Sequence, residues 1–386
     1  MNESNLIKWP TWPHYGADEY CVVDRVIKSN QIFADIEVRK FEEQYAEYLR
    51  CGFALGLGNA TQGLHLALAA LDIGVGDEVI VTPYSWISSA SCILMQNAVP
   101  VFCDIENESF GLNPLEIEKN ITKRTKAIIV VHMFGYPSKI VEIASIAKKY
   151  GIALIEDASH VHGAKVGGVN LGNFGEVSVF SLHQRKSLSV GDGGIVCTSN
   201  EKIYNKIKRL RSFGHDDLSY NYRMTEFAGA LGQVALSKLD QHNKIRQKNA
   251  NLLAELLCNN KFLKVVLGRQ NEEAVYYAIL IELVDNFSDL DIRIARLQNL
   301  GIPIRKTWEP LHAHTHFNPI NVPARGLPWK HPEYFGVMKD KVYSSLNLPV
   351  VNEFCPNKLI ELYVHPPTGT SEIIFAARNI DLVFSS

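Results

Sequence analysis

The sequence predicts an α/β protein: a large domain with a mostly parallel mixed sheet flanked by helices, followed by a small α/β C-terminal domain. Three observations lead to this fold class. Between about residues 40 and 200, short β-rich runs alternate with helical patterns. A long helical stretch, Thr225–Leu257, then continues with few helix breakers, and a second β-rich run follows it. At 386 residues, the chain is long enough for two domains with a sizeable core.

Helices and strands are predicted to alternate through the first domain. Because ligands of such sheets bind at the carboxyl ends of the strands, the residues that follow each strand are candidates for a site. The predicted helices are Val38–Leu49, Thr61–Leu71, Ile87–Gln96, Pro114–Lys119 and Ile140–Tyr150. The predicted strands are Glu78–Thr82, Val99–Asp104, Ala127–His132, Ala153–Glu156, Val177–Ser181 and Gly194–Thr198.

We divide the chain into an N-terminal arm (1–15), a large domain (16–245) and a small C-terminal domain (246–386). The boundary is placed within the long helix. The arm contains Trp9-Pro-Thr-Trp12-Pro13, a rigid aromatic stretch that we expect to dock on its own domain or on a partner subunit. The small domain is predicted to hold a β-rich run, a helix and a Pro- and His-rich segment: Val275–Leu283, Leu290–Leu300 and Ile302–Pro332.

Composition excludes several classes of protein. A formal net charge of −2 gives no basic surplus for a nucleic-acid partner. No apolar stretch is long enough to insert in a bilayer, and no signal peptide is visible at the N-terminus. The seven cysteines show no C-x-x-C spacing, and we interpret them as reduced core residues of a cytoplasmic protein.

A single lysine stands out for chemistry. Lys186 lies in the polar segment Ser181-Leu-His-Gln-Arg-Lys186, between an apolar strand and a glycine-rich turn. That position can aim its amine inward, where it can form a Schiff base with an aldehyde. The obvious aldehyde is pyridoxal 5′-phosphate (PLP).

PLP also needs an anion for its pyridine nitrogen, an aromatic partner for its ring and donors for its phosphate. Asp157, at the carboxyl end of an apolar strand, suits the first role, although it can equally cap a turn. Trp86 also follows a strand and suits the second, although such aromatics are more often core. The small residues around Ala60 and Thr61 open a helix, where free N–H groups favour an anion, or they are a plain N-cap.

A polar, aromatic turn precedes the long helix. It contains Asn221, which could donate to a phosphate, and Arg223, which could hold the turn. Its simpler interpretation is a helix start capped by Thr225.

These segments, in this order, resemble the DegT/DnrJ/StrS family of PLP-dependent sugar aminotransferases. The resemblance covers nearly the whole chain, including the linking stretch from Pro100 to Pro137. It implies a fold-type I PLP-dependent transferase. In the family pattern S-F-H-x-x-K-x-L-x-x-G-E-G-G, the lysine forms the Schiff base, and Lys186 falls on it.

The resemblance implies further roles. Asp157 would pair with the pyridine nitrogen and Trp86 would stack on the ring, while the phosphate would be held by the backbone of Ala60 and Thr61 and the Ser181 hydroxyl. Asn221 falls on a position that reaches into the neighbouring subunit's site, which implies a homodimer with shared active sites.

The chain departs from the family pattern at three places. The usual small Ser-Gly-Thr at the phosphate helix is Asn59-Ala60-Thr61, and the usual Glu of the glycine turn is Asp192. His160 stands where Gln is usual, beside the cofactor's 3-hydroxyl. An imidazole can donate there, but its charge titrates near neutrality unless its pKa is shifted.

The sequence leaves the role of two groups of residues open. His312, His314 and His316 alternate, so on a strand they would share one face, but no fourth ligand is apparent and we assign no metal. Arg305 and Lys306 could face an anionic substrate or be a solvated basic pair.

The expected activity is transfer of an amino group from glutamate or glutamine to a keto- or aldehydo-sugar, in cell-surface glycan or lipopolysaccharide biosynthesis. Within the family, the specific prediction is conversion of 8-oxo-Kdo to 8-amino-Kdo (Kdo is an octulosonic acid). The alternatives are a nucleotide-linked keto-hexose or an inosose as acceptor. A different class of protein, a PLP-binding regulator without turnover, also stays open.

Overall fold

The computed structural model describes residues 6–33, 35–213, 218–317, 328, 331–334 and 343–385. Its largest element is a seven-stranded sheet in the order β1-β9-β8-β5-β4-β2-β3. Neighbours among β8, β5, β4, β2 and β3 pair in parallel, whereas β9 is antiparallel to both β1 and β8. The predicted mixed, mostly parallel sheet is confirmed. The strands are β1 (Phe53–Leu57), β2 (Glu78–Val81), β3 (Val99–Phe102), β4 (Thr125–Val131), β5 (Ala153–Asp157), β8 (Val177–Ser181) and β9 (Gly194–Thr198).

Helices cover both faces of this sheet. In β2, Val79 and Val81 belong to one buried apolar cluster and Ile80 to another, because successive side chains of a strand point to opposite faces. The first cluster includes side chains of α3 (Ala60–Ala70), α4 (Ser88–Met95) and α7 (Glu201–Arg211). The second includes those of α2 (Ile36–Leu49), α5 (Pro114–Asn120) and α6 (Ile140–Tyr150).

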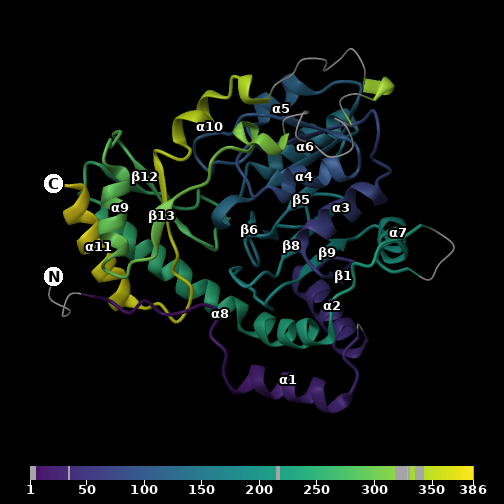
Figure 1. Ribbon diagram of the computed structural model, residues 1–386, viewed down its shortest axis with the longest axis horizontal. Helices are drawn as coiled ribbons and strands as arrows, with labels where there is room; N and C mark the ends of the chain where they lie inside the picture. Colours follow the sequence, from purple (N-terminus) through teal and green to yellow (C-terminus); the bar gives the residue numbers. More distant parts are fainter. Residues whose placement is uncertain are drawn as a thin grey trace.

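The C-terminal part is built on a second, antiparallel sheet in the order β10-β12-β14-β13. Helix α8 (Glu226–Leu257) runs from beneath the large sheet to this smaller one (Figure 1), and the predicted boundary at 245/246 lies within it. The strands are β10 (Leu263–Val265), β12 (Ile279–Leu283), β13 (Ile304–Lys306) and β14 (Leu359–Leu362), and the helices are α9 (Leu290–Gln298), α10 (Pro349–Phe354) and α11 (Thr370–Phe384).

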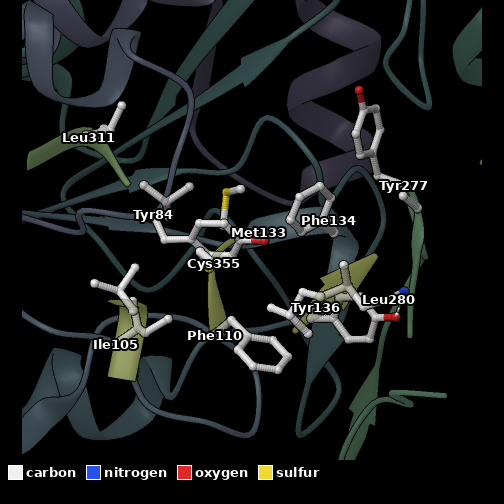
Figure 2. Close-up of a cluster of buried hydrophobic side chains, with 14 of the residues drawn as sticks. Tyr84, Ile105, Phe110, Met133, Phe134, Tyr136, Tyr277, Leu280, Leu311 and Cys355 are labelled. Atoms are coloured by element: carbon white, nitrogen blue, oxygen red, sulfur yellow. Dashed lines mark hydrogen bonds between the residues drawn. The ribbon is translucent and has the colours of Figure 1, made fainter. Parts of the chain in front are cut away.

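An apolar seam joins the two sheets. Figure 2 shows Met133, Phe134 and Tyr136, which follow β4, in one cluster with Tyr277 and Leu280 of the small domain. The Tyr136 hydroxyl donates to the Val266 carbonyl at 3.0 Å and accepts from the Leu280 N–H at 3.0 Å. These two hydrogen bonds satisfy a buried hydroxyl and link the segment after β4 to the smaller sheet.

The N-terminal arm docks on its own chain. The Ile7 N–H donates to the Leu300 carbonyl at 3.1 Å. Trp12 stacks on His365, with ring centroids 4.9 Å apart, and its indole N–H donates to the Lys186 carbonyl at 2.9 Å. Of the two docking sites predicted for the arm, the structure shows the one on the chain itself. Between the arm and α2 lies α1 (Ala17–Ser29), which no sequence pattern had predicted.

No helix in the described part of the chain combines the length and the apolar character needed to cross a membrane. All seven cysteines are free. Cys92, Cys103, Cys197 and Cys355 are buried, as predicted, but Cys21 and Cys258 are exposed. The interpretation of the cysteines as core residues is therefore wrong for these two: Cys21 lies in α1, and Cys258 is the C-cap of α8.

Candidate active site

A cavity of about 400 Å³ opens at the carboxyl ends of β2, β4, β5 and β8 and at the N-terminus of α3. This is the edge at which parallel sheets bind ligands. Its wall brings together residues that are far apart in the sequence. Of the predicted site residues, those that line it are Ala60, Thr61, Trp86, Asp157, His160, Ser181 and Lys186.

Asp157 ends β5 and is almost fully buried. Its Oδ2 accepts a hydrogen bond from Ser89 Oγ at 2.7 Å, and Ser89 Oγ is in turn 2.7 Å from Ser85 Oγ. Its Oδ1 accepts from the Ser159 N–H at 3.3 Å. These contacts hold the carboxylate on the floor of the cavity. Sequence reasoning missed Ser85 and Ser89, which meet because Ser85 lies in the bend before α4 and Ser89 in its first turn.

The N-terminus of α3 forms another wall. Asn59 is the N-cap, because its Oδ1 accepts from the Gln62 N–H at 3.0 Å. The Thr61 hydroxyl lies 2.7 Å from Ser88 Oγ. The backbone approaches closely here, since a Cβ on Gly194 would lie 2.7 Å from the Ala60 nitrogen. The result is a helix start with small side chains whose free N–H groups suit an anion.

Lys186 and His160 meet inside the cavity. Lys186 Nζ lies 2.6 Å from His160 Nε2, and His160 Nδ1 accepts from the Phe134 N–H at 3.2 Å. Since Nδ1 is an acceptor, the ring proton of a neutral His160 must be on Nε2. Nε2–H then donates to Lys186 Nζ, which can accept only as a neutral amine.

The environment shifts both groups toward their neutral forms. Burial, together with the nearby Lys186 charge, holds the pKa of His160 well below its usual range. Burial lowers the pKa of Lys186 to about 8, against the opposing effects of Asp157 and Glu361. The departure from the family pattern at position 160 therefore places an uncharged donor, not an imidazolium, beside the lysine.

Aromatic rings flank the lysine. Tyr277 stacks on His160, with centroids 4.2 Å apart and planes at 3°, and its ring lies 4.9 Å from Lys186 Nζ. Trp86 stands at the rim, 60% exposed, in edge contact with Trp308 at 5.7 Å. Trp86 thus has an open side at the cavity and is not a core residue. Sequence reasoning missed Tyr277 and Trp308, which come from the small domain.

Ser181 ends β8 at the cavity wall. Its carbonyl accepts from His162 Nε2 at 2.8 Å, and His162 Nδ1 lies 2.9 Å from the hydroxyl of the buried Tyr45. Burial lowers the pKa of His162 to about 3, so this ring is neutral. His162 therefore holds the end of β8 in place from behind.

Asn221 is exposed and does not line the cavity. Arg223 holds its turn as predicted: its guanidinium donates to Ser212 Oγ at 2.7 Å and stacks on Phe33 and Phe213. Thr225 caps α8 as predicted, because its hydroxyl accepts from the Ala228 N–H.

The alternating histidines do not form a strand. Leu311–Ala313 and Thr315–Phe317 are short 3₁₀ helices, so His312 and His314 do not share a strand face. Pro310 begins a turn before this segment, and in a 3₁₀ helix side chains align every three residues, whereas on a strand they align every two. Among the described residues, no group of three or more His, Cys, Asp or Glu side chains gathers as a metal site.

Arg305 and Lys306 separate. Arg305 lines the cavity, and its guanidinium contacts the buried carboxylate of Glu361 and the Tyr363 hydroxyl. Lys306 instead forms an ion pair with the exposed Asp291 at 2.9 Å. The two do not act as a pair, because neighbouring residues of a strand point to opposite faces.

The cavity meets each requirement of PLP with a residue in place: an amine, a carboxylate, a helix start and an aromatic rim. Comparison with known proteins decides the class. The profile of the DegT/DnrJ/EryC1/StrS aminotransferase family matches residues 13–353. The chain belongs to this family. It is a PLP-dependent aminotransferase with the fold-type I architecture.

Its similarity to individual family members is extensive. The chain is 32% identical over 342 residues to the L-glutamine:2-deoxy-scyllo-inosose aminotransferase of Streptomyces kanamyceticus, covering 81% of this chain and 80% of that protein. It is 35% identical over 243 residues to a pleiotropic regulatory protein of Geobacillus stearothermophilus, covering 61% and 65%. A solved aminotransferase of Psychrobacter cryohalolentis superposes with a TM-score of 0.87 at 27% identity, covering 98% and 99%.

The lowered pKa of Lys186 predicts how PLP loading of this aminotransferase depends on pH. Only the neutral amine attacks an aldehyde, so the rate at which PLP adds to the cofactor-free protein should rise with pH, reach half its maximum near pH 8 and level off about one unit higher. For an ordinary lysine the rise would continue to about pH 10.4. Stopped-flow absorbance between pH 6 and 10.5, with N-acetyl-lysine as the control, measures this profile. A rate that still climbs above pH 9 would contradict it.

Proposed function

We propose that the protein transfers an amino group from glutamate or glutamine to a sugar carbonyl, with Lys186 as the residue that holds PLP and moves the proton. When bound, PLP supplies the aldehyde that exchanges amines and a ring that withdraws electrons. The observation that carries the proposal is the contact between Lys186 Nζ and His160 Nε2 at 2.6 Å, which holds the amine inside the cavity. A neutral amine of this kind can take up a proton as a base and return it as an acid.

The other residues would bind and orient. Asp157 would keep the pyridine nitrogen protonated, held in place by Ser89 and Ser159. The free N–H groups of Ala60 and Thr61 and the Ser181 hydroxyl would bind the phosphate, Trp86 would cover the ring, and His160 would donate to the cofactor's 3-hydroxyl oxygen.

For the acceptor, we propose a sugar that is not linked to a nucleotide, and specifically 8-oxo-Kdo, the precursor of 8-amino-Kdo in lipopolysaccharide biosynthesis. Relatives that act on an inosose support an acceptor without a nucleotide. Free cysteines on the surface, Cys21 and Cys258, support a reducing compartment such as the cytoplasm.

The wild-type protein can test the transfer directly. Mixing PLP-loaded protein with L-glutamate, without acceptor, should bleach the absorbance of lysine-bound PLP and yield one pyridoxamine phosphate per site with one 2-oxoglutarate. Adding a keto-sugar should then restore the original spectrum. Chromatography of the released cofactor provides the product count.

A regulator without turnover is the second candidate, because a regulatory protein is among the similar chains. The same experiment separates the two. A regulator binds PLP but accumulates no pyridoxamine phosphate with either glutamate or glutamine, and that result would eliminate the transferase.

We also propose a homodimer in which Asn221 reaches the partner subunit's phosphate site. Asn221 is exposed and lies outside its own cavity. Around its turn, the apolar side chains of Phe33, Phe213 and Leu218 are 62%, 58% and 94% exposed, which is a large apolar surface for a monomer to leave open. Sedimentation should give a dimer. Asn221→Ala should weaken PLP binding while the protein stays a dimer. A monomer with intact PLP affinity would refute this arrangement.

A further inference from the structure

A second cavity, of about 330 Å³, adjoins the first. Trp9, Pro10 and Trp12 of the N-terminal arm form one side of it, and Pro303, Ile304 and Tyr363 of the small domain form another. Two residues line both cavities, Arg185 and Arg305. We call the boundary that these two arginines form the neck.

The two arginines of the neck differ in their partners. The Arg305 guanidinium contacts the Glu361 carboxylate and the Tyr363 hydroxyl, so its charge is compensated. Arg185 is exposed, and its backbone N–H donates to His183 Nδ1 at 3.3 Å. Within the described part of the chain, its guanidinium forms no hydrogen bond or ion pair. The neck therefore has one positive charge without a counter-ion.

That charge acts on the catalytic cavity. Arg185 contributes to lowering the pKa of Lys186 and of Glu361, after the larger effects of burial and of closer partners. With Arg305 neutralised by Glu361, the net charge of the neck matches a monoanion. A carboxylate fits a guanidinium well, since it accepts two parallel N–H bonds. A diphosphate brings more negative charge than one free arginine balances.

We propose that Arg185 binds a carboxylate of the substrate at the neck, while Arg305, fixed by Glu361, shapes the neck on the opposite side. This inference rests on the proposed aminotransfer, and it narrows the substrate to an acid. It also assigns to Arg185 the anion-binding role that the sequence had suggested for Arg305 and Lys306.

The carboxylate has two sources, the acceptor sugar and the amino donor. The two arginines line the second cavity as well as the first, whereas Lys186 lines only the first, so a carboxylate bound from the second cavity lies away from the reacting amine. In 8-amino-Kdo the acid and the amine are at opposite ends of the molecule. In glutamate, one carboxylate is attached to the carbon that carries the amine. The neck therefore favours a sugar acid.

Calorimetric binding to the protein loaded with pyridoxamine phosphate tests the proposal without catalysis, because an amine cannot react with that form. The probes are 8-amino-Kdo, its methyl ester and L-glutamate. We expect Arg185→Gln to weaken binding of 8-amino-Kdo about 10-fold, as loss of a charge-assisted hydrogen bond at an exposed arginine does, and to leave the ester unchanged. Arg185→Lys should retain part of the affinity. Lys306→Gln is the matched control, because Lys306 pairs with Asp291 outside both cavities, and it should bind all probes as the wild type does.

The outcomes separate clearly. A loss for 8-amino-Kdo alone identifies the sugar acid, and a loss for glutamate alone identifies the donor as the source of the carboxylate. Equal affinity of wild type and Arg185→Gln for both acids overturns the inference. The transfer itself is judged separately, by the amount of pyridoxamine phosphate that wild-type protein forms, so it can stand if the inference falls.

Discussion

Replacing Lys186 by alanine should lower the rate of amino transfer by about 10⁴-fold or more, because the general acid–base group is lost. It should also remove the absorbance of lysine-bound PLP, since Lys186 is the amine that contacts His160 Nε2 in the part of the chain that the structure describes. Both readouts are needed: the first reports proton movement and the second reports attachment of the cofactor. Steady-state kinetics and an absorbance spectrum of the purified variant measure them.

Two controls isolate the role of this amine. Lys165→Ala removes a lysine that pairs with Glu273 on the surface, and it should transfer at the wild-type rate. Methylamine added to Lys186→Ala should restore part of the rate, because a free amine can take the vacated place. If Lys186→Ala turned over normally and kept its visible absorbance, the assignment of Lys186 would be wrong.

The largest loss of stability is expected at Glu156, next to the cofactor-facing Asp157. Its carboxylate is fully buried and accepts from the N–H groups of Gly172, Phe174 and Gly175 at 2.7 to 2.8 Å. His132 Nε2 lies 3.3 Å away, and its Nδ1 accepts from the Ser138 N–H, so Nε2 is a donor. Four donors thus depend on one side chain.

Glu156→Ala should reduce the free energy of unfolding by about 3–5 kcal/mol, because it leaves several buried donors without an acceptor. Urea unfolding of the PLP-loaded protein, followed by circular dichroism, measures the change. Glu176→Ala is the matched control, since among the described residues the Glu176 carboxylate accepts one backbone N–H, that of Leu154, and the expected loss is about 1 kcal/mol. A change at Glu156 no larger than at Glu176 would refute the account.

The regular α/β part of the fold could be predicted closely from the sequence. Strands β8 and β9 and helix α6 have the predicted bounds, because apolar runs flanked by glycine or polar turns carry a strong local signal. Strand β1 was missed because Phe53-Ala-Leu-Gly-Leu57 has little β propensity. It is a strand because it pairs with β9, a contact between segments about 140 residues apart that no local pattern shows.

The residues of the candidate site also fall into those that the sequence predicts and those that it does not. Lys186, Asp157 and the start of α3 lie next to strand ends, where the order of elements alone predicts a site. Tyr277, Trp308 and Arg185 were not singled out. The first two reach the cavity only because the C-terminal part packs against the large sheet, and Arg185 is set apart by lining both cavities. Such properties depend on tertiary structure.

Trp86 and Trp308 stand in edge contact at the rim of the cavity, and they are two of the five tryptophans of the chain. Their indole emission therefore originates beside the place where the cofactor's coloured ring would lie. Quenching of this tryptophan fluorescence would therefore measure, in solution and without a label, how much of the protein has cofactor bound. The same signal would follow exchange between the two cofactor forms in real time.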